Sequence, residues 1–430
     1  MSKIRILVVS NTPWNDSNSF GSSYSNIFGG NDNYEIANIY CRPGLPNTKV
    51  CKRFFQITEK TIISNLFKKN KRVGTEVVPS SEEEVIQSSQ AFEFGQRHRW
   101  RILYWIRNCV WGGGRWQSPS LDEYIDSFKP DIIFQPIYYS TYIGEIGLYA
   151  KKRMRVPMIG YISDDNYTLH QYSISPFYWI ERLIVRRYVK RVIDSCSLLY
   201  TITPKQRDEY NAIFGNKCKV LTKGCEFKSA TLPEYNLHSP IRLMYAGGLG
   251  NGRWKTLSKI AEGIASFNTG KCKAMLYVYS PTHLNKNQLS KLNVDGVSTF
   301  CGSVSQKELR EKQEDIDVFV HVESFDMKER YTARLSFSTK ITDYLQTGKC
   351  VLAVGWKETG AIELLKDNNA AWVITQEKSV KKDVVELLSN PIKIKEIGRN
   401  GYEFGKKQFD IYYIRDMLYK DILITISHES

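Results

Sequence analysis

Hydroxyl and cationic side chains that could bind an anion occur together in the segment SFSTKITDYLQTGK of this 430-residue chain. Ser338 and Thr339 directly precede Lys340 at the expected start of a short helix. A lysine in the first turn opposes the helix dipole, so this position favours a bound anion such as phosphate over a purely structural role. A solvated lysine on an ordinary helix is the alternative interpretation.

A second candidate for anion binding is the glycine-rich segment GGLGNGRWK, which follows an expected strand over 241–246. Gly247 and Gly248 allow close approach of the backbone, and Arg253 can contact phosphate oxygens through two N–H groups. The dinucleotide-binding motif requires a glycine where Arg253 stands, and the P-loop requires lysine followed by serine or threonine. Neither motif matches, but the residue types still predict a phosphate-binding loop.

Carboxylates and a further glycine-containing loop follow other expected strands. Asp164 and Asp165 end the strand that begins at Pro157, and Glu323 follows another apolar run. Gly21 lies in a loop of small polar residues after the first strand, where backbone amides could bind a phosphate or a sugar. Ligands of open α/β sheets bind at the carboxyl ends of the strands, so these are candidate site residues. Capping of a helix or loop remains an alternative for the acids, and a plain flexible loop for Gly21.

Parallel sheets are predicted to hold these loops. Short apolar runs, rich in β-branched residues, recur at 4–9, 35–40, 130–139, 157–162, 198–202, 241–246, 317–322 and 350–354. They alternate with helical patterns, which is typical of an α/β protein. The chain is too long for one ordinary core, and the aperiodic, proline-containing segment 229–240 reads as a linker. We therefore predict one domain over 1–235 and a second over 236–407.

The net charge of +15 predicts an anionic partner, which could be a nucleic acid, a membrane surface or a phosphorylated substrate. Segment 51–118 has 12 basic and 6 acidic residues interleaved with aromatics, and 151–191 has 9 basic and 3 acidic residues. Such segments suit an anionic membrane surface. A basic helical insertion packed on the domain is the alternative for 51–118. No nucleic-acid-binding motif is visible.

One helix in the basic half is predicted to be amphipathic. It extends over 176–193, with Ile180, Ile184, Tyr188 and Val192 along one stripe and Arg182 and Arg186 among the remaining residues. We expect the stripe to face the domain and the arginines to form part of a positive surface.

Several classes of protein are disfavoured by the sequence. Nine cysteines occur without a CxxC pair, and no cluster of histidine and aspartate suggests a metal site, so no metal is expected. Free cysteines favour the reducing cytoplasm. The apolar run at the N-terminus is too short for a signal peptide, and no stretch reaches the roughly 18 apolar residues of a membrane span. A cytoplasmic protein, soluble or peripheral on a membrane, is expected.

The order of these motifs resembles the C-terminal domain of GT-B glycosyltransferases, close to the retaining family-four type that builds bacterial surface polysaccharides. The resemblance is carried by the loop with Arg253, Gly302 and the helix after it, Glu323-Ser324-Phe325, Ser338-Thr339-Lys340, Asp343-Tyr344-Leu345 and Gly348-Lys349. It implies two Rossmann-like domains that face each other across a cleft. The last segment, 408–430, is similar to the family's C-terminal helix, which crosses back to the first domain.

The resemblance also implies roles for single residues. Arg253 and Lys340, with the amides near Ser338 and Thr339, would bind the diphosphate of a nucleotide sugar, next to the glycines Gly247 and Gly248. Ser303 and Val304 would contact the nucleobase through their backbone, Glu323 and Asp343 would lie near the ribose and the sugar, and Asp164 or Asp165 would face the acceptor. The family's usual pair of glutamates is absent, because Leu335 and Asp343 occupy those positions.

We therefore expect a glycosyltransferase that moves a sugar from a nucleotide sugar to a glycan or lipid-linked acceptor, at the inner face of the cell membrane and without a cofactor. Preorganised cations and helix amides would stabilise the charge that develops on the leaving diphosphate. A nucleotide-sugar epimerase or hydrolase on the same fold is one alternative. A non-enzymatic protein that binds nucleic acid through its positive charge is another.

Overall fold

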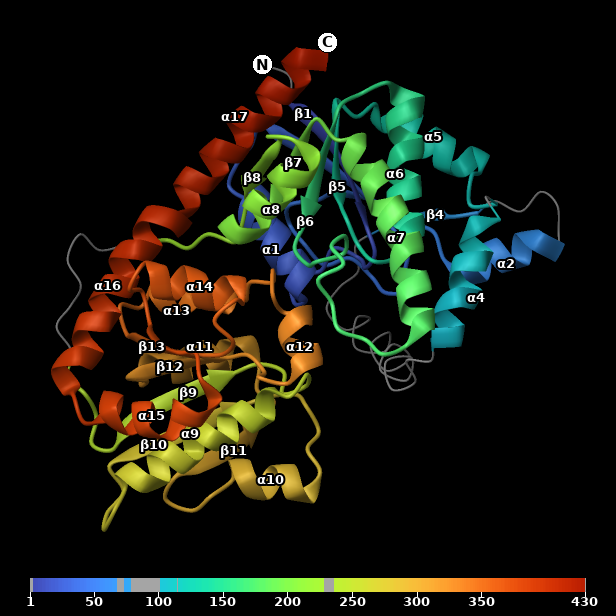
Figure 1. The fold of residues 1–430 in the computed structure, drawn as a ribbon. Coiled ribbons are helices and arrows are strands. Elements are labelled where there is room, and N and C mark those ends of the chain that lie inside the picture. Colours follow the sequence, from blue (N-terminus) through green and yellow to red (C-terminus); the bar gives the residue numbers. More distant parts are fainter. Residues whose placement is uncertain (1–2, 68–72, 79–100, 114, 228–235, 430) are drawn as a thin grey trace.

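The computed structural model describes residues 3–67, 73–78, 101–113, 115–227 and 236–429. It contains two α/β domains, one above the other in Figure 1, each built on its own sheet. The first sheet ends at Val220 and the second begins at Ile241, on either side of the predicted boundary. Within the described residues, no helix combines the length and the apolar character that crossing a membrane requires.

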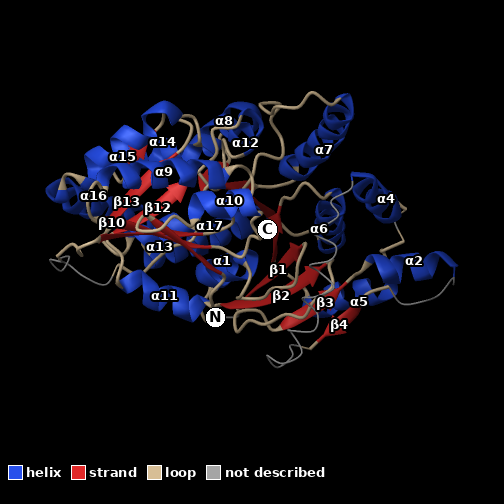
Figure 2. Cartoon of the chain, turned by 90° about the horizontal axis from the view of Figure 1, so that it is seen from below, coloured by secondary structure: helices blue, strands red, loops and turns tan. Residues whose placement is uncertain are grey.

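The first domain has an eight-stranded sheet in the order β4-β3-β2-β1-β5-β6-β7-β8. All neighbouring strands are parallel except β3 and β4. Figure 2 shows β1, β2, β3 and β4 side by side in this order. The strands are β1 (Ile4–Ser10), β2 (Tyr34–Tyr40), β3 (Arg53–Gln56), β4 (Thr75–Val77), β5 (Ile132–Pro136), β6 (Met158–Ile162), β7 (Leu198–Thr201) and β8 (Cys218–Val220). The helices are α1 (Ser19–Phe28), α2 (Glu59–Phe67), α4 (Arg101–Gly112), α5 (Pro119–Phe128), α6 (Thr141–Met154), α7 (Pro176–Asp194) and α8 (Pro204–Phe214).

The second domain has a six-stranded, fully parallel sheet in the order β11-β10-β9-β12-β13-β14. Its strands are β9 (Ile241–Ala246), β10 (Ala274–Tyr279), β11 (Ser298–Gly302), β12 (Val318–Val322), β13 (Cys350–Val354) and β14 (Trp372–Ile374). Its helices are α9 (Arg253–Phe267), α10 (Lys286–Leu292), α11 (Gln306–Glu314), α12 (Met327–Thr332), α13 (Lys340–Leu345), α14 (Gly360–Asp367), η1 (Glu377–Ser379), α15 (Val380–Leu388) and α16 (Pro391–Phe409). The strand order reverses between β9 and β12, which is where such sheets bind ligands.

The central strands are apolar on both faces because helices cover both faces. In β1, Leu7 and Val9 belong to one buried cluster, whereas Ile6 and Val8 belong to another on the opposite face of the sheet. All five residues of β13 are buried, as the continuous apolar run over 350–354 predicts. The continuous apolar runs therefore mark these strands correctly as fully covered.

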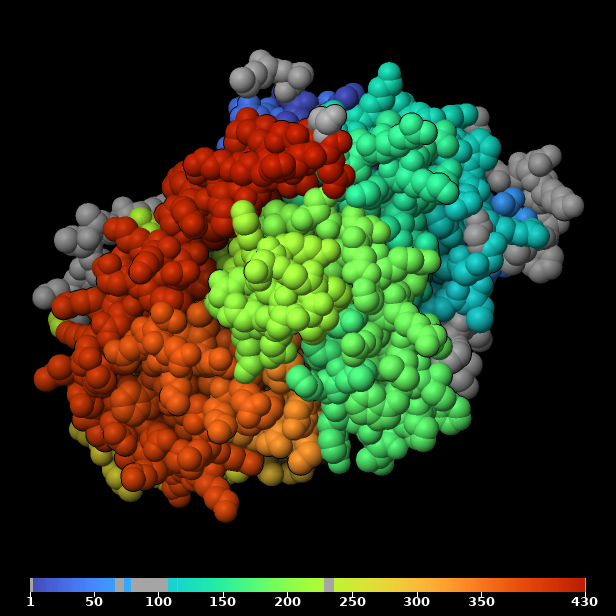
Figure 3. Space-filling model, turned by 45° about the horizontal axis from the view of Figure 1, so that its top comes forward, coloured from blue at the N-terminus to red at the C-terminus, as the bar shows by residue number. Residues whose placement is uncertain are grey.

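The last helix, α17 (Ile411–Glu429), leaves the second domain and packs on the first (Figures 1 and 3). Leu418 and Ile422 enter the core of the first domain. Asp421 accepts a 2.7 Å hydrogen bond from the Tyr200 hydroxyl and lies 2.6 Å from the ammonium group of Lys219. At the start of α17, the amide of Ile411 donates to the carbonyl oxygen of Cys225, so both connections between the domains meet at one point.

The predicted orientation of α7 is wrong in its first half. Ile180 and Ile184 are about half exposed, whereas Arg182 is only 3% exposed. Arg182 is buried because its guanidinium group donates to the carbonyl oxygens of Asp165 and Thr168 in the loop before the helix. Arg182 therefore does not belong to a positive surface. Part of the other basic segment, 51–118, lies outside the described residues.

Candidate functional site

Two cavities lie between the two domains, and a small pocket of the second domain adjoins one of them. The α1 cavity, of about 890 Å³, lies between α1 and α13, and the Asp164 cavity, of about 750 Å³, lies between the loop after β6 and the start of α13. A smaller pocket of about 60 Å³, the Arg253 pocket, shares Arg253, Glu323 and Ser338 with the Asp164 cavity. It contains the candidates for phosphate binding.

The Arg253 pocket brings together residues that are far apart in the sequence. Arg253 begins α9 and binds the carboxylate of Glu323 with both Nε and Nη2, at 3.0 to 3.1 Å. Lys340 begins α13, and its Nζ donates a 2.8 Å hydrogen bond to the carbonyl oxygen of Ala246 at the end of β9. The carboxyl ends of β9 and β12 hold these groups in place, as expected for a ligand site of an open α/β sheet.

Burial shifts the pKa values of the ionisable side chains in this pocket. It raises the pKa of Glu323, although the nearby Arg253 opposes the change. Burial also lowers the pKa of Lys340, and repulsion from Arg253 lowers it further. Burial acts in the same direction on Arg253, but attraction to Glu323 outweighs it and the pKa of Arg253 is raised. The pocket lining thus contains two cationic side chains, Arg253 and Lys340, and one carboxylate, Glu323, which favours an added anion.

The backbone around the pocket leaves room for such a ligand. Gly247 and Gly248 both line it, and a Cβ atom on Gly247 would lie 3.1 Å from Nζ of Lys340. Ser338 also lines it. The side chain of the N-cap residue Thr339 accepts no hydrogen bond from the backbone N–H groups in the first turn of α13. Of the residues predicted to bind phosphate, Gly247, Gly248, Arg253, Ser338 and Lys340 line this one pocket.

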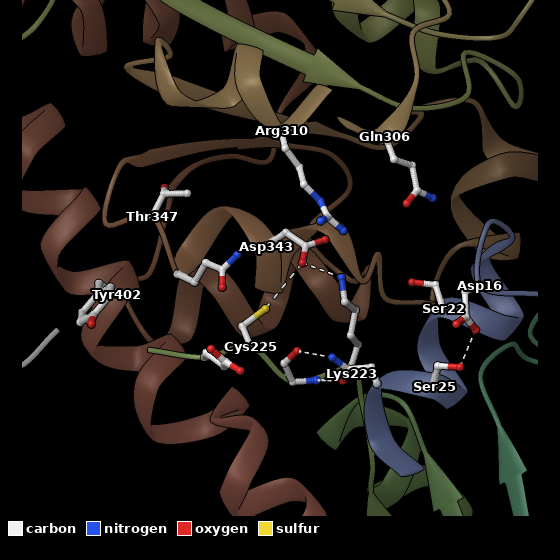
Figure 4. Close-up of a pocket in the computed structure, with 14 residues that line it drawn as sticks. Asp16, Ser22, Ser25, Lys223, Cys225, Gln306, Arg310, Asp343, Thr347 and Tyr402 are labelled. Carbon is white, nitrogen blue, oxygen red and sulfur yellow. Dashed lines mark hydrogen bonds and ion pairs between the residues drawn. The ribbon is translucent and has the colours of Figure 1, made fainter. Parts of the chain in front are cut away.

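The α1 cavity places Asp343 opposite a cation from the first domain (Figure 4). Nζ of Lys223 lies 2.5 Å from Oδ1 of Asp343, and Sγ of Cys225 lies 3.6 Å from the same oxygen. Gln306 and Arg310 of α11 line the opposite side of this cavity. Ser303 and Val304, the candidates for contact with the nucleobase, lie in the short link between β11 and α11, just before Gln306.

Asp164 and Asp165 have different surroundings. Asp164 lines the Asp164 cavity and accepts a 3.1 Å hydrogen bond from the hydroxyl of Ser336 in the other domain. The protein atoms around the cavity raise the pKa of Asp164 by burial. The carboxylate of Asp165 instead accepts bonds from the amide of Thr168 at 2.8 Å and from Arg182 at 3.2 Å. Both residues line the cavity, but the Asp165 carboxylate is held by its own loop, whereas the Asp164 carboxylate bonds to Ser336 of the other domain.

Gly21 does not supply a free amide. It lies in the first turn of α1, where its N–H donates a 2.7 Å bond to the side chain of the N-cap residue Asn18. A Cβ atom at this position would lie 2.0 Å from the carbonyl oxygen of Asn15, so the backbone contact requires glycine. The prediction of a ligand-binding amide at Gly21 is corrected to a packing role. Ser22, the next residue, does line the α1 cavity.

Sequence reasoning missed three residues of the site. Lys223 and Arg310 line the α1 cavity, and His321 lines the Arg253 pocket. Lys223 and Arg310 are two of 60 basic residues, and nothing in the local pattern distinguishes them. His321 interrupts the apolar run of β12 two residues before Glu323, which is a signal that could have been used. In the parts of the chain that the structure describes, no group of three or more metal-ligating side chains is found.

Comparisons with known proteins support the fold. No protein-family model and no curated protein sequence matches this chain. Among solved structures, Anabaena HepE in complex with UDP and glucose matches with a TM-score of 0.61 and 11% identity, over 97% of this chain and 99% of that chain. Sucrose-phosphate synthase from Thermosynechococcus elongatus matches with a TM-score of 0.59 and 12% identity, over 98% and 99%.

A third solved structure, α,α-trehalose 6-phosphate synthase from Burkholderia multivorans, matches with a TM-score of 0.61 and 9% identity, over 100% of this chain and 98% of that chain. Identities this low establish similarity of fold. The expectation of two Rossmann-like domains across a cleft is confirmed, and the chain has the GT-B fold of these glycosyltransferases.

Proposed function

We propose that this protein is a glycosyltransferase that moves a sugar from a nucleoside-diphosphate sugar to a glycan or lipid-linked acceptor, with retention at the anomeric carbon. The observation that carries the proposal is the Arg253 pocket on a GT-B fold, in which the partly buried Arg253 and the exposed Lys340 lie together beside the Asp164 cavity. The diphosphate occupies the pocket, the nucleoside the α1 cavity and the acceptor the Asp164 cavity.

Arg253 and Lys340 perform the central chemical task. Cleavage of the bond between sugar and diphosphate puts negative charge on the leaving group, and fixed cations stabilise that charge most in the transition state. Because these side chains already supply positive charge, we propose that the reaction needs no added metal. Glu323 and Asp343 hold hydroxyl groups of the sugar and the ribose. Uridine is the first nucleoside to test, since the HepE structure contains UDP.

A lipid-linked acceptor is supported by exposed apolar side chains beside the Asp164 cavity. We name them the α7 apolar face: Leu169, Tyr172, Ile174, Phe177, Ile180, Leu183 and Ile184, with exposed fractions from 42% to 90%. Gln171 and Tyr178 of the same segment line the cavity. The face therefore borders the proposed acceptor site.

The charges around this face suit the anionic surface of a membrane. Glu181 is the only acidic residue between 166 and 193, and it is buried, whereas Arg187 is exposed on the same helix. An apolar face with neighbouring arginines is typical of proteins that lie on anionic lipid. We propose that the enzyme works at the cytoplasmic surface of a membrane, where a lipid-linked acceptor presents its head group to the cavity.

Thermal-shift measurements with UDP, GDP, CMP and their sugars test the donor site. A ligand that binds only the folded state raises the melting temperature by mass action, so no acceptor has to be known. We expect a shift with one nucleoside diphosphate that Lys340→Ala abolishes and that EDTA leaves unchanged. Lys382→Ala, at an exposed lysine of α15, is the control and should keep the shift. A folded protein that responds to none of these nucleotides would contradict the proposal.

A further inference from the structure

His321 is a buried polar residue without a role in the reaction proposed above. It is the fourth residue of β12, its side chain is 7% exposed, and it lines the Arg253 pocket. Its Nε2 atom is buried and has no hydrogen-bond partner within the described residues. Buried polar atoms in native proteins nearly always have partners, so an open one beside a ligand pocket needs an explanation.

The imidazole of His321 is neutral. Burial lowers its pKa to about 3, and repulsion from Arg253 and Lys340 acts in the same direction. A neutral imidazole carries one proton, on either of the two ring nitrogens. Nε2 lies 3.8 Å from Oε1 of Glu323, and this negative charge favours the proton on Nε2. His321 is therefore a hydrogen-bond donor without an acceptor, close to a carboxylate.

Glu323 and a bound diphosphate would compete for the N–H groups of Arg253. Without ligand, its guanidinium group holds both oxygens of Glu323. A diphosphate in the pocket competes for the same N–H groups, because Arg253 and Lys340 are the cations that line it. Glu323 is 6% exposed and would then lose part of its hydrogen bonding in a buried position. Another donor must replace what Arg253 withdraws if the carboxylate is to stay charged.

We propose that His321 is the positioning residue for Glu323. When Arg253 turns to the diphosphate, Nε2–H of His321 donates to Oε1 of Glu323 and keeps this carboxylate ionised and oriented towards the sugar. The inference rests on the proposed function, since it takes a diphosphate as the ligand. It adds a role for a neutral histidine that transfers no proton.

The proposal predicts how Glu323 titrates. Arg253 from α9 binds Glu323, and Lys340 from α13 and Tyr245 of β9 line the same pocket. On the side of the Asp164 cavity, the charged groups that line it with Glu323 are Asp164, Asp165, Arg182 and Glu329. A hydrogen bond to the charged form of a carboxyl lowers its pKa, so removal of the His321 bond raises the pKa of Glu323. The acidic limb of kcat/KM then moves to higher pH. Each unit of displacement lowers the rate at a pH below the limb about tenfold.

Nuclear magnetic resonance of ¹⁵N-labelled histidine gives the direct test, since the chain has only six histidines. His321→Phe identifies the signal. We expect the neutral form with the proton on Nε2 between pH 5 and 8, and a downfield shift of this proton when UDP or inorganic pyrophosphate is added. Titration of His321 in this range, or the proton on Nδ1, would overturn the proposal. So would an unchanged signal in a protein that binds either ligand.

Kinetics with the sugar nucleotide found by the thermal-shift screen separate positioning from packing. His321→Phe should move the acidic limb to higher pH, whereas His321→Gln, whose side-chain amide can reach the Nε2 position, should restore it. His428→Phe, at an exposed site in α17, is the control. If all four proteins share one pH profile, His321 has only a packing role. Failure of every nucleotide to bind would instead contradict the proposed function, and the pyrophosphate arm would still test His321.

Discussion

Lys223 and Asp343 form an ion pair between the two domains, with 2.5 Å between Nζ and Oδ1. Lys223 follows β8 in the first domain, and Asp343 lies in α13 of the second. Both side chains are partly buried at 19% and 30% exposure and line the α1 cavity. A nucleoside that enters this cavity meets a carboxylate already oriented by a lysine from the opposite domain.

The pair leads to a prediction about ribose recognition. If Asp343 accepts a hydrogen bond from a ribose hydroxyl, Asp343→Asn should weaken UDP binding about 10- to 150-fold, because a hydrogen bond to a charged group contributes roughly 1.5–3 kcal/mol. Isothermal titration with UDP and 2′-deoxy-UDP measures this. The wild type should prefer UDP, and Asp343→Asn should bind the two ligands more equally. The same preference in both proteins would place the ribose elsewhere.

Arg182 and Asp165 are predicted to be structural. Their side chains are 3% and 1% exposed and lie 3.2 Å apart. Arg182→Ala should lower the free energy of unfolding by about 3 kcal/mol, because it removes the nearer of two cations from a buried carboxylate and leaves only Arg334, at 4.0 Å. Denaturant unfolding measures the loss. Arg187→Ala, at an exposed arginine of the same helix, should change stability by no more than about 0.5 kcal/mol. Equal effects of the two substitutions would contradict this assignment.

Asp164 is predicted to reduce stability at neutral pH. Burial raises its pKa in the folded protein, so the folded state binds a proton more tightly than the unfolded state does. The stability from this proton is fully present below the unfolded pKa, near 3.9, and is lost as the pH rises through the folded pKa. Because Asp164 is exposed to the solvent of the cavity, the effect is screened, and Asp164→Asn should melt at a slightly higher temperature than wild type at pH 7.

The difference between Asp164→Asn and wild type should shrink at pH 4.5, where the folded protein increasingly carries the protonated carboxyl. Scanning calorimetry at both pH values measures it. Asp295→Asn, at an exposed site in the second domain, is the control and should show no comparable gain at pH 7. A lower melting temperature for Asp164→Asn at pH 7 would mean that the charged carboxylate stabilises the fold through Ser336.

The α7 apolar face is predicted to hold the protein on anionic lipid. Phe177 and Ile184 are 72% and 52% exposed, so Phe177→Ser with Ile184→Ser should leave the fold intact and reduce co-sedimentation with vesicles rich in phosphatidylglycerol. Ile392→Ser, at a residue that is 80% exposed in the second domain, is the matched control. Equal sedimentation of the double variant and the control would contradict the membrane proposal.

The sequence by itself determined the fold class and the main elements of the phosphate-binding candidate. Apolar runs such as 350–354 mark strands that helices cover on both faces, because burial on both faces excludes polar side chains. Lys340 at a helix start and Arg253 after a glycine loop are unusual for purely structural positions, so they indicate a site locally. Glu323 is marked by its place directly after a strand.

Only the tertiary structure decided which of several similar residues belong together. The choice between Asp164 and Asp165 depends on Arg182, which lies 17 residues further along and turns inward to cap the loop. The same buried ion pair determines which face of α7 turns inward, so the apolar stripe predicts the wrong face. Lys223 meets Asp343 from another domain, 120 residues away, through a contact that domain packing creates and no local pattern encodes.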